Sequence, residues 1–241
     1  MIRGPQQPER LPHGYTNLTT LEGGRVIKRY AGPDAVLRRE AEVKALTALV
    51  GRFPVPAVIE QDDSQLTLSF VPGVPGQEIL EQWPDDVLLA VGRAGRALHG
   101  LDVSATYEMV GGTVLVHGDF GPQNMVFDAT TLQPAAVVDW EFARPGDPVD
   151  DLAWAEWIIR THHPRLVDSL STMFEGYGSR PPWRQRHAAM LEKCRWALDF
   201  VHRWPGADAA SVAMWQRRLE VRRISGSDVE PAGPTLAGFA L

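Results

Sequence analysis

The stretch VLVHGDFGPQNMVFDATTLQPAAVVDWE, residues 114–141, organises the prediction of the whole fold. Three apolar runs alternate in it with polar loops, and short apolar runs bounded by turn residues are typical of buried strands. Polar side chains at the ends of buried strands need partners, so they point to a chemical role. The polar residues in these positions are His117, Asp119, Asn124 and Asp139.

The types and order of these residues favour phosphoryl transfer. An aspartate in a rigid loop after a strand can accept the proton of an attacking hydroxyl, and Asp119 meets that description. Magnesium prefers oxygen ligands and leaves some positions to phosphates and water. The amide oxygen of Asn124 and the carboxylate of Asp139 are therefore the predicted metal ligands. One base and two metal ligands on such a strand-loop-strand unit is the arrangement of kinase chemistry.

The same stretch resembles the catalytic core of the aminoglycoside phosphotransferase and choline kinase family, which are small-molecule kinases. The His-Gly-Asp loop at 117–119 and the Asp-Trp-Glu at 139–141 carry the resemblance. It implies that Asp119 is the catalytic base, that Asn124 and Asp139 bind magnesium, and that His117 is structural. It also implies an α+β, bilobal protein-kinase-like fold with a small β-rich N-terminal lobe and a mostly helical C-terminal lobe.

A cation for the nucleotide phosphates is expected in the N-terminal lobe. Only three of the 24 lysine and arginine residues are lysines, so Lys28 in a predicted strand stands out. It resembles the phosphate-binding lysine of the family, whose usual partner is a glutamate on a helix. Glu40 fits that partner best, with Glu42 as the alternative. Glu40 and Lys44 also form an i,i+4 pair, which would place both on the helix surface instead.

Two further segments resemble nucleotide-binding parts of the family. The turn at 14–17 falls where a loop covers the phosphates, and the Thr16 hydroxyl is a candidate phosphate donor or an ordinary turn residue. Residues 69–71 resemble the hinge that binds adenine through the backbone. The candidate groups there are the carbonyl of Ser69 and the amide of Val71.

The chain is predicted to divide at the segment PGVPG, because prolines and glycines end a strand pattern there. A hairpin around Gly23-Gly24 and a helix from Asp34, with that residue as N-cap, are expected before it. Several packed helices are expected after residue 152. The predicted parts are a nucleotide-binding lobe at 1–71, a hinge at 72–76, a catalytic and acceptor-binding lobe at 77–241, and a loose tail at 225–241 within that lobe.

Composition limits the class of protein. A net charge of −6 and a pI near 5.6 argue against a nucleic-acid partner. The lone Cys194 excludes a disulfide framework and is expected in a helix core. No stretch has the length and apolarity of a signal peptide or membrane span, so we expect a cytoplasmic protein without a membrane partner.

The predicted reaction is transfer of the γ-phosphoryl of ATP, with magnesium, to a hydroxyl of a small molecule that resembles an aminoglycoside. Residues 102–163 are rich in acids, which would attract a cationic acceptor, although metal ligands explain part of this charge. Asp147 or Asp150 is expected to cap a helix, whereas Asp151 and Glu156 are candidate acceptor contacts. Trp154 and Trp157 are expected in the core.

Three questions stay open at the level of sequence. One alternative is a metabolic kinase for an amino alcohol or sugar, and another is a nucleotide-binding pseudokinase without catalysis. The presence of Lys28, Asp119, Asn124 and Asp139 together argues against a pseudokinase. The pattern does not distinguish ATP from GTP and does not indicate the oligomeric state.

Overall fold

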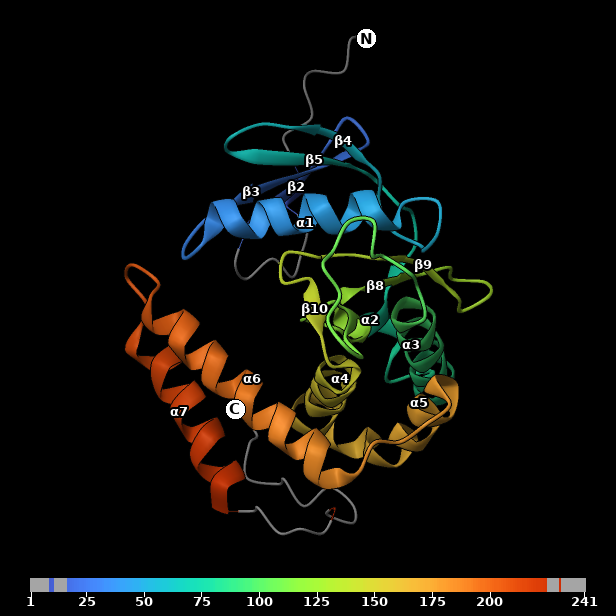
Figure 1. Ribbon diagram of the computed structural model, residues 1–241, viewed down its shortest axis with the longest axis vertical. Coiled ribbons are helices and arrows are strands. Elements are labelled where there is room, and N and C mark those ends of the chain that lie inside the picture. Colours follow the sequence, from blue (N-terminus) through green and yellow to red (C-terminus); the bar gives the residue numbers. More distant parts are fainter. Residues whose placement is uncertain (1–8, 11–16, 225–229, 231–241) are drawn as a thin grey trace.

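The N-terminal lobe of the computed structural model is an antiparallel sheet with one helix beside it (Figure 1). The structure describes residues 9–10, 17–224 and 230. The strand order in the sheet is β1-β2-β3-β5-β4. The strands are β1 (Glu9–Arg10), β2 (Asn17–Glu22), β3 (Arg25–Tyr30), β4 (Val58–Gln61) and β5 (Gln65–Ser69).

The predicted hairpin forms β2 and β3, which pair from Asn17 opposite Tyr30 to Glu22 opposite Arg25. Gly23 and Gly24 make the turn with φ values of 57° and 75°. Positive φ at both central residues is the geometry of a tight hairpin turn, and glycine adopts it without strain. The turn therefore sets the register that places Lys28 in the middle of β3.

Helix α1 (Ala35–Leu49) buries an unusual face, because Arg38 and Glu42 are buried together with apolar residues. These two charged residues lie one helical turn apart on that face. Asp34 is the N-cap residue of α1, as predicted, but its side chain makes no capping hydrogen bond and its φ is 56°. Its carboxylate instead accepts a hydrogen bond from Arg203 at 2.7 Å.

Two small sheets begin the C-terminal lobe. Strand β8 pairs with β6 on one side and with β9 on the other, and β7 pairs with β10. These sheets carry the loops on which the predicted catalytic residues lie. The strands are β6 (Val74–Pro75), β7 (Val114–Val116), β8 (Met125–Phe127), β9 (Pro134–Val137) and β10 (Arg144–Gly146).

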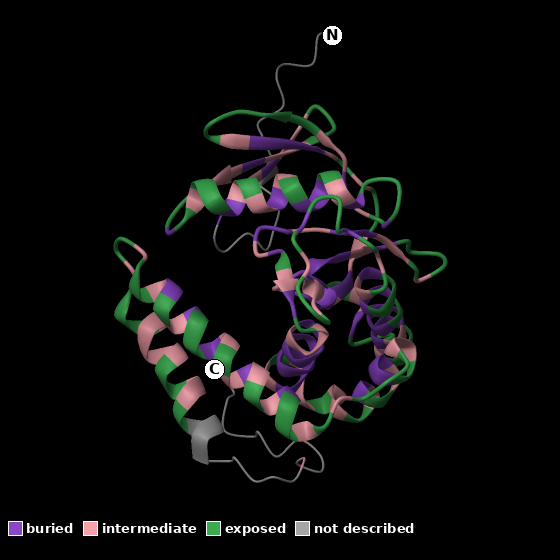
Figure 2. Cartoon of the chain, viewed as in Figure 1, coloured by how far each residue is buried: buried purple, intermediate pink, exposed green. Residues whose placement is uncertain are grey.

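Helices form the rest of the C-terminal lobe, as predicted (Figure 1). Helix α4 is buried along its length from Asp151 to Arg160 and is the central helix of the lobe. Figure 2 shows the buried residues concentrated on α3 and α4, with more exposed residues on α6 and α7. The helices are α2 (Gly76–Ile79), α3 (Pro84–His99), α4 (Pro148–His162), α5 (Leu170–Tyr177), α6 (Trp183–His202) and α7 (Ala209–Ile224), with short 3₁₀ turns η1 (Pro122–Asn124) and η2 (Pro164–Ser169).

Several local predictions are confirmed in this lobe. The side chain of Asp147 accepts a hydrogen bond from the Val149 amide at 2.9 Å and so caps α4. Cys194 is fully buried in α6.

Gly92 allows α3 and α5 to pack closely, since a Cβ there would overlap the carbonyl of Met173. No helix within the described residues combines the length and apolarity required to cross a membrane.

Candidate active site

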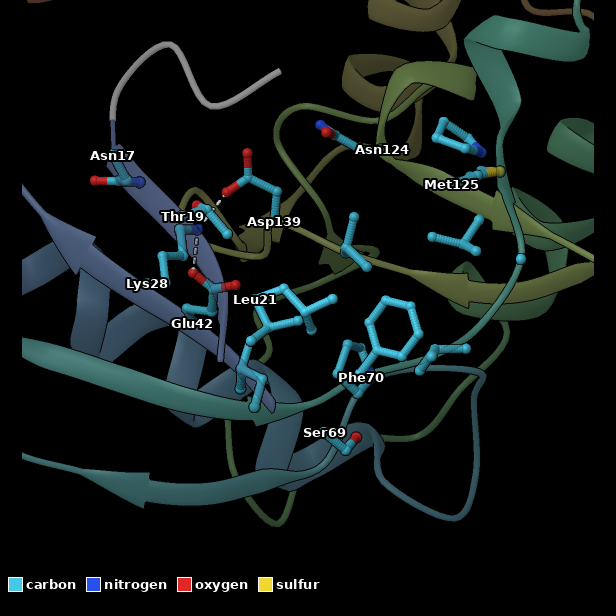
Figure 3. Close-up of a pocket in the computed structure, with 18 of the residues that line it drawn as sticks. Asn17, Thr19, Leu21, Lys28, Glu42, Ser69, Phe70, Asn124, Met125 and Asp139 are labelled. Carbon is cyan, nitrogen blue, oxygen red and sulfur yellow. Dashed lines mark hydrogen bonds and ion pairs between the residues drawn. The ribbon is translucent and has the colours of Figure 1, made fainter. Parts of the chain in front are cut away.

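A cavity of about 440 Å³ is lined by residues of both lobes (Figure 3). Strands β2, β3 and β5 and helix α1 line it from the N-terminal lobe, and the segments around β8 and β9 line it from the C-terminal lobe. Its walls are mostly apolar, with polar groups on the side of β3. The predicted site residues among those that line it are Lys28, Ser69, Val71, Asn124 and Asp139.

The ammonium of Lys28 lies among three carboxylates. It donates to Glu42 at 2.5 Å and to Asp139 (Figure 3). It also lies 3.6 Å from Glu141. Burial disfavours the charged ammonium, but the three carboxylates outweigh that effect and raise the pKa of Lys28 well above its ordinary value. Lys28 is therefore a buried and permanently charged cation beside the cavity.

Glu42 is the helix partner of Lys28, so the prediction of Glu40 is wrong. Glu40 is exposed, whereas Glu42 is buried and also accepts hydrogen bonds from the Tyr30 hydroxyl and, at 3.3 Å, from the Trp140 amide. The two glutamates lie about 200° apart around α1, since each residue turns an α-helix by about 100°. Only one of them can face the sheet.

Glu141 joins the two lobes, and sequence reasoning did not assign it a role. Its buried carboxylate accepts hydrogen bonds from Asn17 at 2.5 Å and from Arg38 at 2.8 Å. Arg38 and Glu42 thus attach one face of α1 to the segment that carries Asp139. In the sequence, Arg38 and Glu42 are an arginine and a glutamate at positions i and i+4 of a predicted helix. This spacing is equally typical of a pair on the helix surface, so it did not indicate the contact with the segment of Glu141.

The loop that begins at His117 is held by backbone and ring contacts. The ring of His117 is fully buried, with Nε2 2.9 Å from the Val138 carbonyl and Nδ1 accepting from the Asp119 amide at 3.2 Å. Gly118 has a φ of 82°, and a Cβ there would overlap the carbonyl of Phe142. A glycine is therefore required at this position of the loop.

Asp151 supports the same loop from below and does not line an acceptor pocket. Its fully buried carboxylate accepts from the amides of His117 at 2.7 Å and Gly118 at 2.9 Å, and lies 3.2 Å from His99 Nε2. Burial opposes its ionisation, but these hydrogen bonds and the neighbouring histidines together hold the pKa of Asp151 below its usual range.

Asp119 is held at both carboxylate oxygens. Oδ2 accepts from Asn124 Nδ2 at 2.9 Å, and Oδ1 accepts from Trp154 Nε1 at 2.6 Å. Burial raises the pKa of Asp119, while the positive charge of Lys193 opposes the rise. The prediction that Trp154 lies in the core holds for its ring, which stacks on Trp157 at 4.5 Å, but its N–H serves the candidate base.

Asn124 and Asp139 are brought together by the pairing of β8 with β9. The Val138 amide donates to the Asn124 carbonyl at 2.9 Å, so Asp139 follows directly beside Asn124. Asn124 Nδ2 donates to Asp119, so the side-chain oxygen of Asn124 points away from Asp119. Asp139 has a φ of 69°, an unfavourable conformation for a residue with a side chain that recurs at functional sites.

An amide oxygen and a partly exposed carboxylate at the cavity wall suit a hard cation such as magnesium. Glu42, Asp139 and Glu141 also form a group whose ligand atoms lie within 4.8 Å of one another. The ammonium of Lys28 already lies among all three carboxylates, and Arg38 pairs with Glu141, so the space between them is occupied by a cation of the chain. The donor set with room for a metal is Asn124 and Asp139.

The other nucleotide residues differ in what can be said of them. Ser69 ends β5 and lines the cavity together with Val71, in the position expected of a hinge. The Ser69 hydroxyl oxygen accepts from the Ala57 amide at 2.8 Å, which fixes the strand end. Thr16 lies outside the described residues.

The geometry is accompanied by a match to a known family. The model of the phosphotransferase enzyme family matches residues 8–111 and 107–189. The chain belongs to this family. The match covers both sides of the cavity and the stretch 114–141, so it supports a phosphotransferase enzyme and the recognition made from the sequence.

Solved structures of aminoglycoside phosphotransferases share the fold. A GDP complex of aminoglycoside 2'-phosphotransferase-IIIa superposes with a TM-score of 0.71 at 15% identity and covers 94% of this chain and 95% of that one. APH(4)-Ia, in a ternary complex with ADP and hygromycin B, has a TM-score of 0.68 at 17% identity, with 92% and 95% covered. The predicted bilobal, protein-kinase-like fold is confirmed.

Curated relatives match only short segments. Acyl-CoA dehydrogenase family member 11 of Gallus gallus is 46% identical over 41 residues, which is 17% of this chain and 5% of that protein. The human protein of that name is 29% identical over 90 residues, or 37% of this chain and 11% of its own length. The chain therefore spans a small part of these relatives.

Proposed function

We propose that this protein transfers the γ-phosphoryl group of ATP to a hydroxyl of a small molecule. In this proposal Lys28 binds the nucleotide phosphates, and Ser69 and Val71 bind adenine through their backbone. These two residues lie just before the hinge, residues 72–76, which links the two lobes. Asp119 orients the acceptor hydroxyl and accepts its proton. Nucleotide use is supported by structural relatives whose names record GDP and ADP complexes.

The observation that carries the proposal is the position of Asn124. Its side chain lines the cavity beside Asp139, and its amide donates to Asp119 at 2.9 Å. One residue thus links the candidate base to the candidate nucleotide site. A base next to a phosphate site, at a boundary between two lobes, is the geometry that in-line phosphoryl transfer requires.

Magnesium would be held by Asn124 and Asp139 and would neutralise charge on the phosphates. The residues of this chain supply the remaining steps. Trp154 and Asn124 hold both oxygens of Asp119, so the carboxylate has a fixed orientation toward a hydroxyl. Lys28 provides a fixed positive charge for the phosphates, with Glu42 keeping its side chain in place.

The test is acceptor-dependent formation of ADP or GDP from ATP or GTP, with and without magnesium, over aminoglycosides, choline analogues, sugars and hydroxy acids. Asp119→Asn should lower the acceptor-dependent rate by about 10²-fold or more, because Asn cannot accept the proton. The matched control is Asp168→Asn, which removes an exposed carboxylate of the same lobe and should keep the rate.

Equal acceptor-dependent rates in wild type and Asp119→Asn would show that Asp119 is not the base. Tight magnesium-nucleotide binding with no transfer to any acceptor would favour a pseudokinase. Circular dichroism of both variants separates loss of chemistry from loss of fold.

A further inference from the structure

Four of the ten acidic residues in the segment 102–163 pair with a lysine or arginine of the same chain. Asp139 pairs with Lys28, Glu141 with Arg38 at 2.8 Å, and Asp150 with Arg144 at 2.9 Å. Further along α4, Glu156 pairs with Arg160 at 2.8 Å and with Arg186. Part of the acidic excess in the sequence therefore serves contacts within the fold and does not by itself indicate a cationic acceptor.

Lys193 is a cation that interacts electrostatically with Asp119 and is not among the residues that line the nucleotide cavity. Lys193 extends from α6, and its Nζ lies 3.8 Å from the centre of the Trp196 ring. The rings of Phe142 and Trp154 lie 5.1 Å and 5.5 Å from the same atom. The N–H of Trp154 also donates to Asp119, so the same indole contacts the candidate base and lies near the ammonium of Lys193.

The ammonium of Lys193 has no carboxylate within 4.0 Å among the residues that the structure describes. Its charge is nevertheless felt at Asp119, where it counteracts the effect of burial on the carboxyl. The aromatic rings attract the ammonium by cation–π interaction, and Lys193 stays partly exposed. The carboxylates of Asp119, Asp150 and Asp151 act on it from beyond ion-pair distance, with Arg144 opposing them. The direct ion-pair position at the ammonium is therefore available to a bound molecule.

We propose that Lys193 determines acceptor specificity by favouring a hydroxylated acceptor with an anionic group near the reacting hydroxyl over one with an ammonium there. This inference rests on the proposed function, because it assumes that the hydroxyl binds at Asp119. An ammonium on the acceptor would approach the like charge of Lys193, which disfavours its binding. A carboxylate or phosphate in the same place would provide the partner that Lys193 lacks.

The experiment uses three two-carbon alcohols that differ only in the group beside the hydroxyl carbon, namely glycolate, ethylene glycol and ethanolamine. Binding to the magnesium-nucleotide complex is followed by ligand-observed NMR, and transfer by the specificity constant. In wild type, glycolate should exceed ethanolamine by about tenfold or more. Lys193→Met should remove most of that ratio, Lys193→Arg should keep it, and Lys193→Glu should reverse it.

The matched control is Arg195→Met, which removes an exposed cation from the same helix and should leave the ratio unchanged. An unchanged ratio in Lys193→Met, a preference of wild type for ethanolamine, or failure of all three alcohols to bind would overturn the assignment of Lys193. Charge-ranked binding without any transfer would contradict the proposed reaction and leave the role of Lys193 standing. Transfer to acceptors of the wider panel without dependence on Lys193 would do the reverse.

Discussion

The cations on the two sides of Asp119, Lys28 and Lys193, have different surroundings. On the nucleotide side, Lys28 contacts three carboxylates, and Arg38 and Glu42 join α1 to the segment of Asp139 and Glu141. On the side of α4 and α6, Lys193 faces aromatic rings and has no ion-pair partner among the described residues. The first side is a closed network of ion pairs around a cavity, whereas on the second a lysine lies over aromatic rings with its acidic neighbours beyond ion-pair distance.

This difference indicates how the nucleotide and the acceptor are recognised in the proposed reaction. A nucleotide presents the same phosphates each time, so a rigid and fully paired network can be positioned for it in advance. An acceptor varies among members of a family with one fold, and a single side chain on a helix can change its selection without disturbing that network. Variants that affect one side and spare the other test this division.

The largest effect is expected on the nucleotide side. Asp139→Asn should lower the specificity constant for magnesium-ATP by about 10³-fold, because it removes a charged metal ligand and the partner of Lys28. The rate is measured as a function of magnesium concentration, with Asp168→Asn as control. Full activity at limiting magnesium would mean that Asp139 does not bind the metal.

Asp151 supports the loop that begins at His117, and its substitution tests this support. Asp151→Asn should lower the free energy of unfolding by about 3 kcal/mol at neutral pH, since a buried carboxylate that accepts from His117, Gly118 and His99 loses its charge. Urea unfolding measures this value. A loss below about 0.5 kcal/mol would show that the contacts are not stabilising.

The pH dependence of that loss has a definite sign. The pKa of Asp151 is lowered in the folded protein, so the unfolded chain takes up the proton first as pH falls. The carboxylate therefore stabilises the fold above its unfolded pKa of about 3.9, and the stabilisation disappears as pH falls through the lower folded pKa. The difference between wild type and Asp151→Asn should shrink in that acid range.

Glu42 belongs to the closed network, whereas Glu40 lies on the surface of α1, so substitutions of the two can be compared. Glu42→Gln should lower the specificity constant for ATP by roughly tenfold to a hundredfold, as expected when a residue that orients a binding group is weakened. Glu40→Gln, two residues earlier and exposed, should have no effect. Equal effects of the two substitutions would contradict the role of Glu42, and both are measured with one acceptor at saturation.

The smallest effect is expected from the titration of Lys193. Burial, aided by Arg144 and opposed by Asp119, Asp151 and Asp150, lowers the pKa of Lys193 to about 8. The preference for glycolate over ethylene glycol should therefore fall by less than about tenfold as pH rises through 8, because the ammonium loses its charge. Lys193→Arg should keep the preference constant across this range. A wild-type ratio that is constant up to pH 9 would contradict the prediction, and taking a ratio of two acceptors cancels other titrating groups.

The sequence allowed the catalytic stretch to be predicted more closely than its surroundings. His117, Asp119, Asn124 and Asp139 lie on one short segment, where strand ends and tight loops restrict their positions. Lys28 could be selected because lysine is rare in the chain and the hairpin turn sets its register. Lys193 belonged to the same small group of lysines, but nothing local indicated which side of the fold α6 would face.

Where the prediction was wrong or silent, the cause was a choice between faces of a helix. Glu40 and Glu42 have the same chemistry, and only the docking of α1 shows which one reaches Lys28. Asp151 and Glu156 read as acids available to an acceptor, although both are buried against partners far away in the chain. Hydrogen bonds between distant segments have no local pattern that a sequence can display.

The sequence by itself determined the fold class, the order of the elements and the candidate residues of the segment 114–141, because strand and turn geometry depend on neighbouring residues. Tertiary structure alone decided how charges are shared. The pairing of Glu141 with Arg38, the support of the His117 loop by Asp151 and the placement of Lys193 over aromatic rings depend on which surfaces meet. The physical reason is that the environment of a charge extends over several ångströms in space, and packing brings segments from both lobes within that range.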